Sequence, residues 1–179
     1  MCARAFADSM RPTTAPSRTS AISRRRVSSA AETSTGAPLL AINRAVYADK
    51  PFSTLALWGL MLAGVERVAG GRIVHASMTA AMLAATAEQP TASEGFVDLL
   101  GTTRTADINI LFKEAGPVET RVSVRTSARA DAVAICGAFG GGGHPRAAGC
   151  TIDRALAEAR DLLLAEAKRE LNRGDARGR

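Results

Sequence analysis

Two consecutive segments with alternating side chains, residues 106–115 and 118–127, constrain the fold more than any other part of the sequence. In ADINILFKEA, Ile108, Ile110 and Phe112 occupy every second position, and VETRVSVRTS alternates valine or threonine with polar residues. This period of two is that of a β-strand, and the intervening Gly-Pro suits a turn, so we predict an antiparallel hairpin. One face of its second strand then carries a row of donors: Arg121, Ser123, Arg125 and Ser127.

Helical and strand patterns surround this hairpin in mixed order. Helices are predicted at 39–49, at 51–69, after the candidate N-cap Thr79, near 93–100, at 131–139 and after the candidate N-cap Asp153, and strands at 72–78 and 148–152. The apolar residues expected to be buried on the 51–69 helix are Phe52, Leu55, Leu57, Trp58, Leu62 and Val65. This mixture predicts an α/β fold, a mixed sheet with flanking helices.

The positive charge of the chain is concentrated at its N-terminus. The formal net charge is +6, but residues 1–36 hold six arginines against only Asp8 and Glu32. Low hydrophobicity with excess charge predicts that 1–37 is a disordered leader, followed by a domain at 38–173 and a disordered tail at 174–179. The same composition fits a transit peptide, or a segment translated from a wrong start or a shifted frame.

The cysteines and the hydropathy pattern favour a cytoplasmic protein. Cys2, Cys136 and Cys150 form no CxxC pair and are odd in number, which suits a reducing compartment. Cys136 and Cys150 are interpreted as small packed residues. No stretch approaches 18 uninterrupted apolar residues, so no membrane partner is expected.

The glycine-rich stretch GGGGHPRAAG at 140–149 is the main candidate for a binding site. It is not a phosphate-binding P-loop, because GxxxxGK[ST] is absent, and Pro145 and Arg146 stand where a dinucleotide-binding pattern needs glycine. Glycines allow close approach of a ligand to backbone amides, and His144 and Arg146 add donors suited to phosphate. The alternative is a flexible turn.

Residues 141–149 match GGGHxxAAG, which resembles the signature of the DHH-associated domain, the C-terminal half of DHH-family phosphoesterases. The segments INRAVYADKP, SEGFVDLL, VSVRTS and AFGGGGHPRAAG occur in the order seen in one group of this family. These are the bacterial oligoribonucleases that also act as 3′-phosphoadenosine 5′-phosphate phosphatases, relatives of the RecJ exonuclease. The resemblance covers about residues 40–172.

The resemblance implies a domain that binds the substrate nucleotide, beside a separate N-terminal domain in which two metal ions, usually Mn²⁺, activate water. The ligands that it implies are a short RNA or DNA oligonucleotide or 3′-phosphoadenosine 5′-phosphate. Carried over onto this sequence, the substrate-binding residues are Ser123, Arg125, Gly141, Gly142, Gly143, His144, Arg146 and Ala147.

The metal-binding half of the family pattern is missing from this sequence. His75 and His144 are its two histidines, and it holds no Asp-His-His triplet and no upstream carboxylate cluster. We therefore expect a binding domain without catalytic residues, and Mn²⁺ only in the absent DHH domain. The alternatives are a fragment that complements a separate metal-bearing DHH chain or forms a homodimer, and hydrolysis by this chain alone.

Several other polar residues are assigned structural roles. His75 is expected to be a strand residue and not a ligand, and Arg121 to be solvated. Glu94 and Asp98 are interpreted as cap and dipole partners at the start of a helix.

Overall fold

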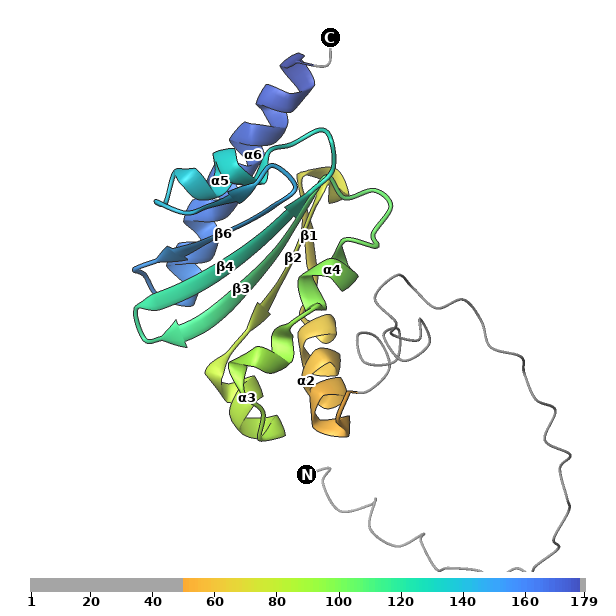
Figure 1. The fold of residues 1–179 in the computed structure, drawn as a ribbon, viewed down its shortest axis with the longest axis vertical. Helices are drawn as coiled ribbons and strands as arrows, with labels where there is room; N and C mark the ends of the chain where they lie inside the picture. Colours follow the sequence, from red (N-terminus) through yellow and green to blue (C-terminus); the bar gives the residue numbers. More distant parts are fainter. Residues whose placement is uncertain (1–49, 178–179) are drawn as a thin grey trace, which may run out of the picture. The chain divides into compact units, whose positions relative to one another are not determined.

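The computed structural model describes residues 50–177 and has the predicted α/β fold, a mixed sheet flanked by helices (Figure 1). Within this range the sheet has six strands in the order β1-β2-β3-β4-β6-β5, and β2 and β3 are parallel neighbours. The strands are β1 (Glu66–Val68), β2 (Ile73–Met78), β3 (Ile108–Gly116), β4 (Glu119–Thr126), β5 (Gly142–His144) and β6 (Ala147–Ile152). The helices are α2 (Phe52–Ala63), α3 (Ala80–Thr86), α4 (Phe96–Leu100), α5 (Ala132–Gly137) and α6 (Leu156–Arg177), with 3₁₀ turns η1 (Ala69–Gly71) and η2 (Pro90–Ser93).

The predicted hairpin is β3 and β4, and it lies at the centre of the sheet. On β4 the alternation is as predicted, because Val122 and Val124 are buried whereas Arg121 is exposed. On β3 all residues from Ile108 to Phe112 are buried, because helices cover both faces of this strand.

Helices α5 and α6 cover one face of the sheet (Figure 1). α6 has an apolar stripe, in which Ala159, Leu163 and Ala167 are fully buried. This stripe packs against the alternate residues of the central strands that face α6: Ile108, Ile110, Phe112, Val122, Val124, Ala148, Cys150 and Ile152. The apolar layer therefore fixes which side chains of β4 and β6 point toward the helices and which point away.

Helices α2, α3 and α4 cover the opposite face, mainly over β2 and β3 (Figure 1). The buried residues of this second core are Leu57, Met61, Val74, Ala76, Met78, Phe96, Val97, Leu100 and Leu111. The segment that contains α3, η2 and α4 also supplies the crossover that parallel strands require. On this side, most of β4 and all of β6 and β5 lack a covering helix within residues 50–177.

The predicted helix at 51–69 was wrong from Gly64 onward. α2 ends at Ala63, and Glu66–Val68 instead pairs antiparallel with β2 as the edge strand β1. Burial on α2 is also narrower than predicted: Leu57 and Met61 are fully buried. The large apolar side chains that stay exposed on this helix are Phe52, Leu55, Leu60 and Leu62. Trp58 is half-buried and packs edge-on against Phe96, as expected of a core residue.

The helix ends confirm one predicted cap and correct another. The Thr79 hydroxyl accepts a hydrogen bond from the Met82 amide at 3.2 Å, as predicted. α6 begins at Leu156, so Asp153 lies too early to cap it. A disordered tail was predicted at 174–179, whereas α6 continues to Arg177. Asp175 of this helix forms an ion pair with Arg72, which also pairs with Asp107, each at 2.7 Å.

The predicted leader at 1–37 and the predicted helix at 39–49 lie outside the described residues. None of the helices within 50–177 has the length and apolar character to cross a membrane.

His75 is a buried strand residue, as expected from the sequence. It lies on β2, 2% exposed, with its ring edge-on to Phe112 at 5.9 Å. Burial lowers the pKa of His75; the charge of Glu66 opposes this shift and that of Arg160 adds to it. The folded state therefore favours the neutral imidazole.

We predict that His75 makes the stability of the domain depend on pH. Because its folded pKa is lowered, its contribution is complete above about pH 6.5 and is lost as the pH falls toward the folded pKa, by at most about 1.4 kcal/mol per pH unit. Urea unfolding of wild type and His75→Leu at about pH 7.5 and about pH 5.5 measures this, and the variant should lose less stability on acidification. Equal losses in both proteins would contradict the assignment.

Candidate functional site

The uncovered side of β4, β6 and β5 brings together most of the residues that the sequence singled out, and we call it the open face. Arg125 of β4 is paired with Ala147 of β6, and Ala147 is paired with His144 of β5. Paired residues project from the same side of a sheet, so these three side chains form one row across the strands. Arg125 and His144 stand at the two ends of this row, with only a methyl group between them.

The neighbouring row across the same strands has even smaller side chains. Ser123 is paired with Gly149, and Gly149 with Gly142. Strands lie about 4.8 Å apart, so Arg125 and His144 are separated by about 10 Å of backbone whose floor is glycine and alanine. This floor leaves room for a flat or phosphorylated ligand between a guanidinium and an imidazole.

Arg125 is held at the edge of the open face by helix α4. Its Nε atom donates to Asp98 Oδ1 at 2.7 Å, and Nη1 donates to the Val124 carbonyl at 3.2 Å. The Asp98 side chain is 61% exposed, so this ion pair contributes little stability and leaves the guanidinium available to a stronger anion. Asp98 lies in the first turn of α4, as expected of a dipole partner, but its ion-pair partner is Arg125.

An open pocket of about 320 Å³ adjoins Arg125, and one of its walls is Asn109. Asn109 is 4% exposed, yet its Oδ1 atom has no hydrogen-bond partner in the part of the chain that is described. A buried polar atom without a partner is uncommon in folded proteins. Thr102 and Ser127 line the same pocket, so several polar groups surround the space beside Arg125.

The glycine-rich stretch is a strand edge followed by a tight turn, and not a free anion-binding loop. The amides of Gly140 and Gly141 donate to the carbonyls of Gly137 and Cys136, at 3.1 and 3.0 Å. These two amides are therefore already bonded within the chain and are not free to bind phosphate. What the stretch gives the open face is the exposed strand β5, which ends at His144.

The fold requires two of the three motif glycines, Gly141 and Gly143, but not Gly142. A Cβ atom on Gly141 would lie 2.3 Å from the Gly149 carbonyl oxygen, and one on Gly143, whose φ is +145°, would lie 2.5 Å from that of Ala147. Both positions thus require glycine for the fold. A Cβ on Gly142 would meet nothing within 4 Å and would project onto the open face.

Arg146 and Ala147 take different places. Ala147 belongs to the floor of the open face, whereas the Arg146 guanidinium donates to the carbonyls of Ser127 and Ala130. These hydrogen bonds connect the β5–β6 turn to the segment that follows β4, so Arg146 has a structural role here. Arg146 nevertheless borders the pocket beside Arg125.

Sequence reasoning missed Lys113, which shares the open side with Arg121 because the two residues are paired across β3 and β4. Alternate residues of a strand share a face, so Lys113 lies on the same side of β3 as Asn109 and Leu111. The alternation of the predicted hairpin could therefore have identified Lys113. Arg121 has a largely exposed side chain, as expected of a solvated residue, and pairs with Glu119 at 3.1 Å.

The two described cysteines are packed residues, as expected. Cys136 is fully buried and Cys150 nearly so. A hydrogen bond with Cys150, together with burial, raises the pKa of the Cys136 thiol, so it stays protonated and un-nucleophilic.

Within residues 50–177, no three His, Cys, Asp or Glu side chains lie close enough together to hold a metal ion. The described residues therefore do not fit the manganese pair that the resemblance implies. The expectation that manganese is bound in a separate DHH domain stays a prediction.

The fold and the open face define the class of this protein: an α/β domain with a glycine-rich strand pair at the sheet edge and cationic residues beside it. The particular family follows from the sequence, because residues 70–173, more than half of the chain, match the DHHA1 domain. The chain belongs to the DHHA1 domain family.

A solved structure shows the same fold. An exopolyphosphatase-related protein from Bacteroides fragilis matches with a TM-score of 0.72 and 21% sequence identity over 79% of this chain. A pGpG-specific phosphodiesterase from Vibrio cholerae matches with a TM-score of 0.43 and 14% identity over 70% of this chain. This chain spans 42% of the first protein and 40% of the second.

We predict that the motif glycines differ in their effect on stability. Gly141→Ala and Gly143→Ala force backbone to move, so each should lower the free energy of unfolding by about 1–3 kcal/mol or more. Gly142→Ala should stay within about 0.5 kcal/mol of wild type, because its new methyl group meets nothing. Urea titrations followed by circular dichroism measure all three, and a large loss in Gly142→Ala would contradict the strand geometry.

Proposed function

We propose that the open face binds the phosphate and base of a short RNA or DNA oligonucleotide, or of a nucleotide such as 3′-phosphoadenosine 5′-phosphate. The observation that carries this proposal is the row in which Arg125 and His144 stand on either side of a floor of alanine and glycine. Membership of the DHHA1 family supports it, because the resemblance carried by residues 141–149 implies a domain that binds the substrate nucleotide.

Each polar group of the open face has a role in this proposal. The planar guanidinium of Arg125 donates two parallel hydrogen bonds to phosphate oxygens, exchanging its contact with Asp98 for a contact with phosphate. The Ser123 hydroxyl adds a neutral donor one step along the strand. His144 lies across the floor and donates to the far side of the ligand, while Gly142 and Gly149 let the ligand approach the sheet.

Catalysis is left to another domain in this proposal. Hydrolysis in DHH-type phosphoesterases is expected to use two manganese ions, which would activate a water molecule. The described residues of this chain bind and orient the nucleotide, and no three of their His, Cys, Asp or Glu side chains lie close enough together to hold a metal ion.

A second candidate function is association with a partner domain or with a second copy of the chain. It is favoured by the exposed apolar side chains of α2, which form the largest such group among the described residues: Phe52, Leu55, Leu60 and Leu62. A metal-bearing DHH domain or a homodimer are the partners that we consider.

We expect Arg125→Ala and His144→Ala each to weaken nucleotide binding by about tenfold or more, because each removes a charge-assisted hydrogen bond to phosphate. Titration calorimetry of 3′-phosphoadenosine 5′-phosphate and of a short RNA into the full chain measures this. Arg129→Ala, an exposed arginine off the open face, serves as the control. Unchanged affinity in both open-face variants would refute the proposed site.

Gly142→Ala provides a test of the floor. Its methyl group would occupy the space of the ligand without disturbing the fold, so affinity should fall by about tenfold at nearly unchanged stability. Gly59→Ala on α2, where an added Cβ also meets nothing, is the matched control and should bind like wild type. Full affinity in Gly142→Ala would mean that the ligand does not contact β5.

A further inference from the structure

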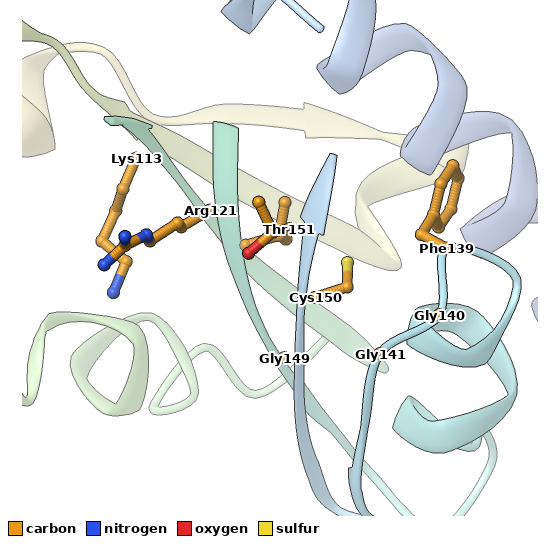
Figure 2. A pocket seen from close by; sticks show the side chains of 9 residues that line it. Lys113, Arg121, Phe139, Gly140, Gly141, Gly149, Cys150 and Thr151 are labelled. Carbon is orange, nitrogen blue, oxygen red and sulfur yellow. The ribbon is translucent and has the colours of Figure 1, made fainter. Parts of the chain in front are cut away.

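A pair of cations lies on the open side of the sheet, away from the row of Arg125 and His144. Lys113 of β3 and Arg121 of β4 are paired residues, and Figure 2 shows their side chains extending together from the same side of the sheet. Their positively charged ends are therefore neighbours, although like charges repel.

The charge of this pair is poorly compensated by the protein. No carboxylate lies within ion-pair distance of Lys113 in the part of the chain that the structure describes, and Arg121 has only its exposed contact with Glu119. Burial lowers the pKa of Lys113, with Arg121 and Arg125 acting in the same direction and Glu94 opposing them. Two adjacent cations repel each other, so an anion bound between them would stabilise the charged form of both.

The space beside the pair is large enough for a ligand group. An open pocket of about 490 Å³ is bounded by Lys113 and Arg121 and continues over Gly149 and Thr151 of β6 (Figure 2). Gly149 also belongs to the floor between Arg125 and His144, so the two regions share one continuous surface.

The spacing of the two regions fits a ligand with more than one phosphate. Arg121 and Arg125 are four residues apart on one strand, which separates their backbones by about 13 Å, with Ser123 between them on the same face. A single phosphate held at Arg125 does not fill both regions. A nucleotide chain laid along β4 presents one phosphate to each region, because the long side chains of Arg121 and Arg125 extend well beyond the backbone.

We propose that Lys113 and Arg121 form a second phosphate subsite, which makes the open face prefer dinucleotides and longer oligonucleotides over mononucleotides. This inference rests on the proposed function, because it needs a first phosphate near Arg125. It gives Arg121 a binding role in addition to its contact with solvent.

The test compares two ligands that differ in phosphate number. Adenosine 5′-monophosphate and the 5′-phosphorylated dinucleotide pApA are titrated calorimetrically into the full 179-residue chain. Wild type should bind pApA about tenfold tighter or more, because the second phosphate meets two cations. Lys113→Gln/Arg121→Gln should lose most of this preference, with a loss on pApA about tenfold larger than its loss on the monophosphate.

A matched variant removes the same charge elsewhere. Arg67→Gln/Lys168→Gln, on the edge strand β1 and on α6, lowers the net charge equally and should keep the preference for pApA. Circular dichroism melting of all three proteins shows that each is folded at the titration temperature.

The outcomes separate the two proposals. If wild type binds neither ligand, the proposed function fails and this inference with it. If wild type binds both and Lys113→Gln/Arg121→Gln keeps the full preference for pApA, the second subsite alone is refuted. Equal losses for both ligands in that variant would also refute it, since they would indicate only a general field effect.

Discussion

The pairing register of β4 with β3 and β6 decides where every candidate functional side chain lies. Successive residues of a strand point to opposite faces, so burial of Val122 and Val124 beneath α5 and α6 obliges Ser123 and Arg125 to face the other way. A slip of one residue would bury the arginines and expose the valines. The apolar core that stabilises this domain is therefore also what orients its candidate site.

The open face exists because the two helical layers are unequal. α5 and α6 extend beneath β3, β4 and β6, whereas the core made by α2, α3 and α4 reaches no further than β3. An antiparallel strand pair tolerates one solvated face, and β4 with β6 is such a pair. The glycine and alanine residues of β6 add no large side chains to that face, while the arginines of β4 form its edge.

The sequence predicted those parts of the structure that depend on short-range patterns. The alternation of 118–127 indicated the hairpin and the shared face of Ser123 and Arg125, and the resemblance of 141–149 indicated the family. β1 was missed because its three residues carry no period of their own and are extended only through pairing with β2. The roles of the glycines were also hidden, because they depend on how closely residues such as Ala148 and Cys150 approach from the adjacent strand.

The bonds around the β5–β6 turn have a consequence for the thermodynamics of ligand recognition. Besides the Arg146 guanidinium, the turn accepts hydrogen bonds at the Pro145 carbonyl from the Thr126 hydroxyl and the Ala132 amide, and at the Arg146 carbonyl from the Thr126 amide. The end of the strand that carries Arg125 and the turn that follows His144 are thus fastened to each other before any ligand arrives. A preorganised surface of this kind loses little backbone entropy on binding, so differences in affinity among ligands should reflect their direct contacts and not loop rearrangement.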